Sequence, residues 1–205
     1  MDIQLILSFL GASVLLALMP GPDNIFVLTE SITRGVRHGV AITTGLVSGV
    51  FVHTAAAATG LSLVLQNSAV AFQLVKYFGA AYLFYLAIQA WREQRMKVKI
   101  EASDDASFNF GKLYSTGFFM NVLNPKVSLF FIAFLPQFVS PQGFHPIVQM
   151  LILGLIFMVS AWLIFVSIAL LAGRLTPYLD NDKFWNITRW LRTGVLVVLG
   201  VFLLL

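Results

Sequence analysis

Two charged side chains, Asp23 and Lys126, lie inside long apolar stretches of this sequence, and each is close to proline. Asp23 directly follows Pro20-Gly21-Pro22, and Lys126 ends the tripeptide Asn124-Pro125-Lys126. A carboxylate and an ammonium held together suit a zwitterionic ligand, because Asp23 can bind an amino group and Lys126 a carboxylate. The two motifs therefore predict a binding site.

The first motif predicts an interrupted helix. Pro20 and Pro22 remove two backbone N–H donors and Gly21 permits a bend, so carbonyl groups one turn earlier lose their partners. Asp23 or Asn24 is then expected to cap a new half-helix. We also expect Asp23 and Asn24 to take part in substrate binding.

The second motif has the residue order of a helix start, with Asn124 as the expected cap and Pro125 at the first helical position. We expect Asn124 and Lys126 to bind substrate, with free N–H groups near Asn124 adding to an anion site. A second interpretation stays open, in which Asp23 and Lys126 form an ion pair with a purely structural role.

The composition indicates that these motifs lie in a membrane. Hydrophobic residues make up 59% of the 205 residues and charged residues only 11%, against roughly 25% charged residues in an ordinary soluble domain. Such a chain cannot cover a water-facing surface, which excludes a soluble protein. Cysteine is absent from the sequence, which excludes disulfides, Fe–S clusters and thiolate zinc sites, and no cofactor is expected.

Apolar runs predict an all-α integral membrane protein with six transmembrane helices in a single domain, residues 1–205. The expected spans are residues 3–31, 40–65, 75–91, 113–139, 146–172 and 188–205. Gln66-Asn67-Ser68 is expected to end the second span.

Six spans divide into two groups of three, which must cross the membrane in opposite senses. We therefore predict two inverted repeats, about residues 1–91 and 113–205, joined by a solvated cytoplasmic connector, about residues 92–112. The first helix of each repeat is the one interrupted at proline.

The distribution of Lys and Arg predicts the orientation, because cytoplasmic loops carry the excess of positive charge. Apart from Lys76 and Lys126, all of the 13 basic residues fall near the loops after the first, third and fifth spans. We expect a multi-pass protein of the inner (plasma) membrane with both termini outside. The basic residues form no run, so binding to nucleic acid is not expected.

A polar face of the second span is a further candidate. Gly45, Gly49 and His53 recur every fourth residue. The glycines indicate close helix packing, and His53 indicates either a simple hydrogen bond or a proton relay or substrate contact. Asp23, His53 and Glu30 are thus the candidates for proton coupling.

Two other polar groups have competing interpretations. Glu30 is four residues before Arg34, which favours a surface ion pair, but it also lies on the cytoplasmic side of the first motif, where it could assist proton or substrate movement. Tyr82, Tyr85 and Gln89 form a polar stripe on the third span, which suits either packing or a site.

Other classes of function have weaker support. An exporter of metals or other small cations needs clustered ligands, but His38, His53 and His145 fall in three separate places, so no metal site is expected. An enzyme needs a nucleophile–base pair, and Ser48 beside His53 is the sole candidate, without a third orienting group. An exporter of another solute, a channel and a structural subunit remain alternatives.

At these motifs the chain resembles the LysE/RhtB family of amino-acid exporters. The resemblance rests on Pro20-Gly21-Pro22 with Asp23, on Asn124-Pro125-Lys126, and on Gly79-Ala80-Ala81-Tyr82-Leu83 in the third span. Ala87 departs from the family pattern, in which glycine is common. The resemblance implies export of amino acids or close derivatives from the cytoplasm, driven by the proton gradient.

The expected function is therefore secondary active export by alternating access, with an amino acid, protons and the lipid bilayer as partners. The residue pattern does not determine an oligomeric state.

Overall fold

The computed structural model describes residues 2–61, 69–92, 108–140, 143–179 and 181–204. Within these ranges the chain forms nine α-helices and no strand, which confirms the predicted all-α class. Three helices are long and apolar enough to cross a membrane, and the number rises to five if each of two bent helix pairs is one span. These helices give a multi-pass membrane protein.

The first bent pair consists of α1 (Ile3–Leu18) and α2 (Pro22–Arg34), whose axes differ by 57°. The bend lies at the predicted Pro20-Gly21-Pro22 motif, where two N–H donors are missing from the helical ladder. The predicted interruption of the first helix is therefore confirmed.

The cap of α2 differs from the prediction. Gly21 is the N-cap residue and has an extended backbone, Pro22 takes the first helical position, and Asp23 and Asn24 follow in the first turn. Proline is favoured at the first helical position because its φ is already helical and its missing N–H has no intrahelical role there. This preference moves the cap upstream and leaves the side chains of Asp23 and Asn24 available for other contacts.

The chain reverses after α2 at Gly35, whose φ of 94° favours glycine. The next helix, α3 (Val36–Ala56), continues into the π-helical turn η1 (Ala57–Leu61). α3 contacts α2, α6 and α8, and it is therefore the central helix of the bundle.

The second bent pair begins with α6 (Phe110–Val122) and continues through α7 (Pro125–Leu129). Two short helical turns, η2 (Phe130–Phe134) and η3 (Leu135–Phe138), extend α7. The axes of the pair differ by 50°. Asn124 caps α7 and Pro125 occupies its first position, so this predicted helix start is confirmed.

Glycines bring α3 and α6 close together. A Cβ atom added to Gly45 would meet the carbonyl oxygen of Tyr114, and one added to Gly117 would meet that of Ile42. A Cβ atom on Gly49 would likewise be too close to α6. Small residues permit such backbone approach between membrane helices. The predicted close packing at Gly45 and Gly49 is confirmed.

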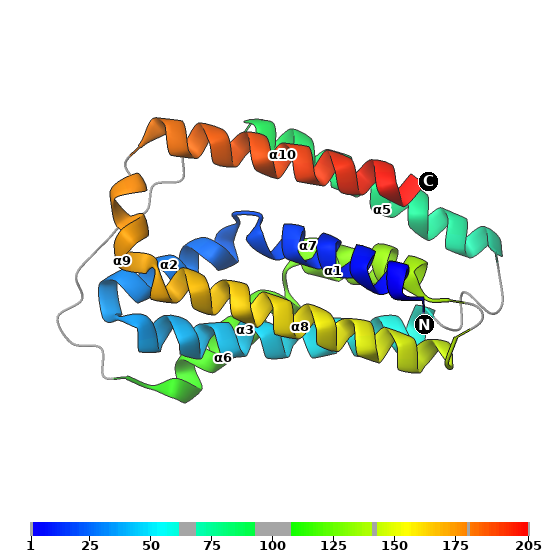
Figure 1. Ribbon diagram of the computed structural model, residues 1–205, viewed down its shortest axis with the longest axis horizontal. Helices are drawn as coiled ribbons and strands as arrows, with labels where there is room; N and C mark the ends of the chain where they lie inside the picture. The colour runs from blue at the N-terminus through cyan, green and yellow to red at the C-terminus, as the bar shows by residue number, and fades with distance from the viewer. Residues whose placement is uncertain (1, 62–68, 93–107, 141–142, 180, 205) are drawn as a thin grey trace.

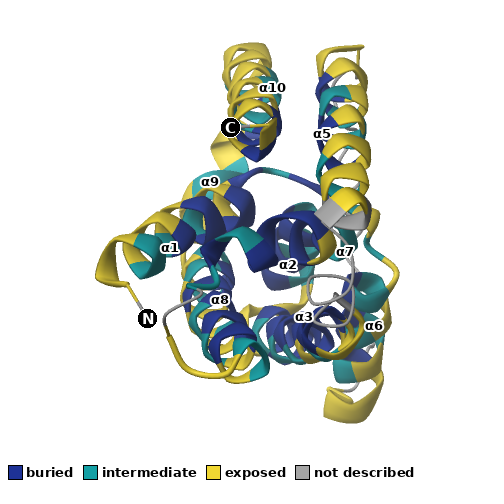
Figure 2. Cartoon of the chain, turned by 90° about the vertical axis from the view of Figure 1, so that its right-hand side faces the viewer, coloured by how far each residue is buried: buried dark blue, intermediate teal, exposed yellow. Residues whose placement is uncertain are grey.

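The remaining long helices are α5 (Ala69–Arg92), α8 (Pro146–Leu170) and α10 (Asp182–Leu204). A short helix, α9 (Ala172–Leu175), and the turn η4 (Thr176–Tyr178) join α8 to α10. Figure 2 shows α5 and α10 side by side and set apart from the other helices, and we call them the outer helix pair.

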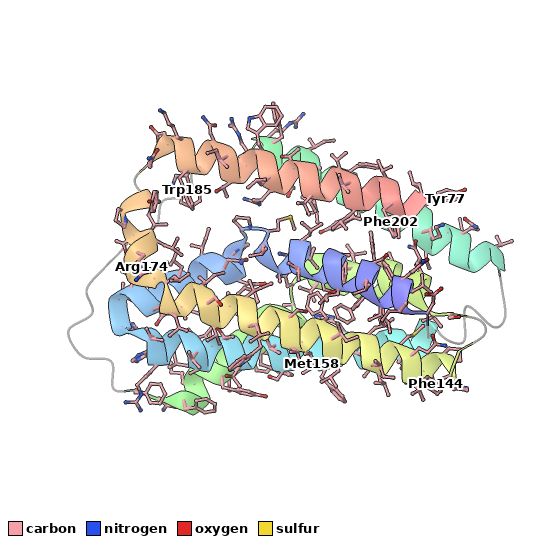
Figure 3. All side chains as sticks on the ribbon, in the orientation of Figure 1. Tyr77, Phe144, Met158, Arg174, Trp185 and Phe202 are labelled. Atoms are coloured by element: carbon pink, nitrogen blue, oxygen red, sulfur yellow. The ribbon has the colours of Figure 1, made fainter. Side chains whose placement is uncertain are left out.

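Aromatic residues connect the outer helix pair to the rest of the bundle. Phe202 on α10 points towards the helices below it in Figure 3 and stacks on Phe134 and Phe138, with ring centroids 5.8 Å apart in both cases. Phe138 also packs edge-on against Phe9 of α1 at 5.2 Å. Such contacts add to the burial of the rings.

The two chain ends lie at the same end of the bundle in Figure 1, because long helices alternate in direction along the chain. Arg174 lies at the opposite end, and Phe144 at the end that holds the termini, as Figure 3 shows. α2 and α8 end, and α3, α6 and α10 begin, at the end that carries Arg174, whereas α5 ends beside the first half of α10, where Trp91 packs edge-on against Trp190.

Helix ends differ from the predicted spans. The sixth span begins at Asp182 instead of residue 188, and the third at Ala69 instead of residue 75. α10 gains a polar turn at its start, beyond the apolar run that a hydropathy pattern detects, whereas the turn that α5 gains, residues 69–74, is apolar apart from Gln73. Gln66-Asn67-Ser68 and residues 93–107 of the predicted connector fall outside the described residues.

Candidate functional site

The two helix breaks meet inside the bundle and are linked by a hydrogen bond. Asn124 Nδ2 donates to Asp23 Oδ2 at 2.6 Å, which joins two motifs that are 101 positions apart in the sequence. Asp23 is only 5% exposed. A hydrogen bond to a charged acceptor is stronger than one between neutral groups, and the two motifs therefore form one site.

The carbonyl groups freed by the first break are bound by polar side chains. Leu16 lies four residues before Pro20, and its oxygen accepts a hydrogen bond from Lys126 Nζ at 3.4 Å. The oxygen of Ala17, one position later, accepts from Asn24 Nδ2 at 2.8 Å. Buried carbonyls need such partners. Lys126 and Asn24 thus stabilise the broken helix end.

The carbonyl freed by the second break is bound in a corresponding way. Asn121 lies four residues before Pro125, which has no N–H to donate to it. Its oxygen instead accepts from the backbone N–H of Asn124 at 2.9 Å and lies 3.1 Å from His53 Nε2. His53 is 8% exposed. The structure therefore places His53 at the second break.

Asp23 and Lys126 do not form a direct ion pair in the part of the chain that the structure describes. Both residues nevertheless line the same small pocket. Asn124 contacts Asp23, and Lys126 contacts the carbonyl of Leu16. Two separate hydrogen bonds thus connect the two breaks, one from Asn124 to Asp23 and one from Lys126 to the carbonyl of Leu16.

The start of α7 has its backbone N–H groups occupied. The N–H of Lys126 donates to Asn124 Oδ1 at 3.0 Å, and those of Val127 and Ser128 donate to Asn124 O, both at 3.1 Å. The expectation of free N–H groups near Asn124 is wrong, because the capping residue itself satisfies them. Recognition of an anion at this point falls to the ammonium group of Lys126.

A cavity of about 600 Å³ lies between the two breaks and the outer helix pair, and we call it the large cavity. This volume is within the range of about 300 to 1,000 Å³ that is typical of small-molecule sites. Its wall contains both motifs and parts of α5 and α10. The lining residues are Met19, Pro20, Gly21, Pro22, Leu86, Gln89, Ala90, Arg92, Asn124, Pro125, Lys126, Arg192 and Leu196.

A small pocket of about 20 Å³ lies on the other side of Lys126, among α1, α3, α6 and α8. Asp23, Asn121 and Lys126 are its polar lining residues. Asn121 Oδ1 and Asn24 Oδ1 are buried acceptors without a hydrogen-bond partner among the described residues. An unpaired buried acceptor costs about 1 to 3 kcal/mol, so these oxygens favour a ligand that donates hydrogen bonds.

Sequence reasoning missed Arg92, Arg192 and Asn121. Arg92 and Arg192 line the large cavity, although the charge pattern assigned them to the membrane boundary. Asn121 lies three residues before Asn124. This pair of asparagines ahead of Pro125 is the one sequence signal that pointed to Asn121. The role of the arginines depends on how α5 and α10 pack, which no local pattern specifies.

The remaining polar candidates lie apart from the breaks. Glu30 pairs with Arg34 at 3.4 Å, as the favoured interpretation predicted. Tyr82 and Tyr85 pack with their ring centroids 5.7 Å apart, and Gln89 donates to the hydroxyl of Tyr85. Of this stripe, Gln89 alone belongs to the lining of the large cavity.

The histidines and Ser48 make separate contacts. Ser48 Oγ donates to Gly45 O at 2.8 Å, and His53 is held at the second break. His38 packs edge-on against Phe108, and His145 precedes α8 as its cap. Across the described ranges, no three His, Cys, Asp or Glu residues cluster in a way that could hold a metal ion.

Comparison with known proteins gives a match to the family model of the LysE type translocator over residues 14–205. The homoserine/homoserine lactone efflux protein of Salmonella typhimurium is 34% identical over 177 residues, which cover 86% of this chain and 84% of that protein. The leucine efflux protein of Salmonella choleraesuis is 28% identical, over 86% of this chain and 82% of its own length.

An uncharacterized membrane protein of Vibrio cholerae is 31% identical over 89% of this chain and 88% of its own length. No solved structure matches the chain. The range matched by the family model contains both helix breaks and every residue that lines the large cavity.

Proposed function

The chain belongs to the LysE type translocator family, and from this premise we propose that it is a secondary active exporter of amino acids or close derivatives. Two of its relatives are named as efflux proteins for homoserine or homoserine lactone and for leucine. The observation that carries the proposal is the site at which the two helix breaks meet, beside a cavity large enough for an amino acid.

The geometry suits a zwitterion that passes Lys126 and extends from the small pocket into the large cavity. Lys126 lines both the large cavity and the small pocket, whereas Asp23 lines only the small pocket. The amino group of the substrate would lie on the side of Asp23, near the unpaired Oδ1 atom of Asn121, which lines the same small pocket. Its carboxylate would remain in the large cavity and bind the ammonium of Lys126.

Asn124 has a double role in this proposal. Its side chain binds Asp23 through Nδ2 and caps α7 through Oδ1. A ligand that binds the Asp23 carboxylate competes with this hydrogen bond and so changes the contact between the two breaks. Substrate binding and movement of one half of the protein against the other are coupled in this way.

Six spans arranged as two inverted repeats suit this coupling. The bent pair α1–α2 corresponds to α6–α7, α3 to α8, and α5 to α10. The apolar-span test does not include α5, but this 24-residue helix packs along α10 and is the sixth span in the proposal. The positive charge near Arg174 is then cytoplasmic, and both termini face outside the inner membrane.

Asp23 is the group best suited to couple export to protons. It is a carboxyl group inside the membrane, and one of its oxygens is already engaged by Asn124. Glu30 is paired with Arg34, and His53 is held by Asn121 O, so both have structural tasks. Protonation of Asp23 would remove the charge that holds the substrate amino group.

The test is efflux from cells that overproduce the protein and are loaded with amino acids through dipeptides, with and without a protonophore. We expect homoserine, leucine or a related neutral amino acid to leave faster than from vector controls, and the protonophore to stop this efflux. If no amino acid in a panel of neutral, basic and hydroxylated types leaves faster, the proposed function is wrong.

A further inference from the structure

The charged residues that line the large cavity are all positive. They are Arg92 at the end of α5, Lys126 at the start of α7 and Arg192 in α10. No Asp or Glu occurs among the described residues of this lining. Arg192 and Lys126 line this cavity from two different helices, α10 and α7. The cavity therefore has a positive wall built from three separate helices.

Positive charges gathered around one cavity inside a membrane protein favour an anionic group between them. Arginine offers a planar fork of N–H donors that fits a carboxylate, whereas the lysine ammonium acts as a compact charge. The backbone N–H groups at the start of α7 are occupied, so these side chains are the anion-binding groups of this wall. The negative side chain of the site, Asp23, faces the small pocket instead.

We propose that Arg92 and Arg192, together with Lys126, form a carboxylate-recognition subsite in the large cavity. The subsite selects substrates with a free carboxylate over amides, esters and lactones of the same amino acid. This inference rests on the proposed export of amino acids, because it states which group of that substrate, the carboxylate, binds in the large cavity.

The placement of the arginines also gives the subsite a mechanical consequence. Arg92 and Arg192 belong to the outer helix pair, whereas Lys126 belongs to the bundle that contains the breaks. A carboxylate bound by all three joins the outer helix pair to α7. An analogue without the carboxylate lacks this connection, so it should be a poor substrate and not merely a weak ligand.

The experiment uses the purified full chain in proteoliposomes with an imposed pH gradient and measures transport of labelled leucine and homoserine. Unlabelled leucine, leucinamide, homoserine and homoserine lactone serve as competitors. For the wild type we expect the amide and the lactone to compete about tenfold or more weakly than the parent amino acid, the effect of losing a hydrogen-bonded charge.

Arg92→Gln and Arg192→Gln should weaken competition by the amino acid about tenfold and leave competition by leucinamide unchanged, which lowers the discrimination between the two. Arg174→Gln and Lys183→Gln are matched controls, because these exposed bases lie outside the cavity lining. Both controls should keep wild-type discrimination. The inference is wrong if leucinamide competes as well as leucine in the wild type, or if both cavity variants keep full discrimination.

Calorimetric binding of leucine and leucinamide to the same preparation separates the two proposals. If the protein transports leucine but neither competition nor calorimetry distinguishes leucine from leucinamide, the carboxylate subsite is wrong and the proposed export function stands. If leucine binds more tightly than leucinamide but no transport is measured, the carboxylate subsite stands and the proposed export function is wrong. The wild-type comparison needs no variant, so poor folding of Arg92→Gln or Arg192→Gln does not prevent the test.

Discussion

Lys126 Nζ lies 3.4 Å from the carbonyl oxygen of Leu16, the group that Pro20 leaves without its usual helical donor. A side chain from the second break thus completes the hydrogen bonding of the first. Because Lys126 also lines both cavities, a substrate carboxylate can draw its ammonium away from Leu16. In the proposed function the same residue both binds the ligand and stabilises the break.

The link between Asn124 and Asp23 predicts a specific pair of variants. Asn124→Ala removes the hydrogen bond to Asp23 and the cap of α7, so we expect a loss of about 1 kcal/mol in stability and of most transport. Asn109 also caps a helix, because its Oδ1 accepts from the N–H of Lys112 at the start of α6 at 3.0 Å, and it lines neither the large cavity nor the small pocket. Asn109→Ala should lose a similar amount of stability, measured by thermal unfolding in detergent, and retain transport. Equal transport losses in both variants would show that the cap alone matters.

His53 is expected to act as a donor to Asn121 O and not as a proton relay. His53→Gln, which keeps an N–H donor, should retain transport and the wild-type dependence of transport on pH. His53→Leu removes the donor, and we expect a fall in transport of up to about tenfold, from a hydrogen bond worth about 0.5 to 1.5 kcal/mol. Transport rates across a series of pH values check this. A flattened pH dependence in His53→Gln would assign the proton to His53.

The close contact between α3 and α6 predicts that Gly117 does not tolerate a side chain. Gly117→Ala places a Cβ atom against the backbone of Ile42 and should destabilise the protein by about 1 to 3 kcal/mol, because neither backbone can move freely. Gly11 lies in α1 with nothing near its Cβ position, so Gly11→Ala should be neutral or slightly stabilising. Melting temperatures in detergent compare the two. Equal melting temperatures would contradict the close approach of the helices.

The stacking of Phe202 on Phe134 and Phe138 predicts how the outer helix pair is held. Phe202→Ala should weaken this attachment and lower the melting temperature, since aromatic pairs contribute about 0.5 to 1.5 kcal/mol beyond burial. Val201→Ala is a control at the preceding position, which is about as exposed as Phe202 but takes no part in the aromatic stack. If both variants melt at the same temperature, the stack does not hold the pair in place.

Local chemistry explains which parts of this structure are predictable from sequence. Proline and asparagine act within one turn of their own positions, so the two breaks and the cap by Asn124 follow from the sequence. The cap of α2 was predicted two to three residues too late, because Pro22 takes the first helical position and makes Gly21 the N-cap residue.

The site itself depends on tertiary packing. The contact of His53 with Asn121 O joins residues 68 positions apart, and that of Lys126 with Leu16 O joins residues 110 positions apart. A charge pattern along the chain assigns Arg92 and Arg192 to the membrane boundary, yet the packing of α5 on α10 turns both towards one cavity. Such placements follow from the fold and not from any short motif.

The central claim is that Asp23 and Lys126 bind a transported amino acid. The most direct measurement is leucine and homoserine transport by Asp23→Asn and Lys126→Met in proteoliposomes, with Asp2→Asn and Lys76→Met as controls outside both cavities. We predict that both site variants insert into the membrane but lose transport, while both controls transport like the wild type. Full transport by either site variant would contradict the claim and leave its residue with a structural role.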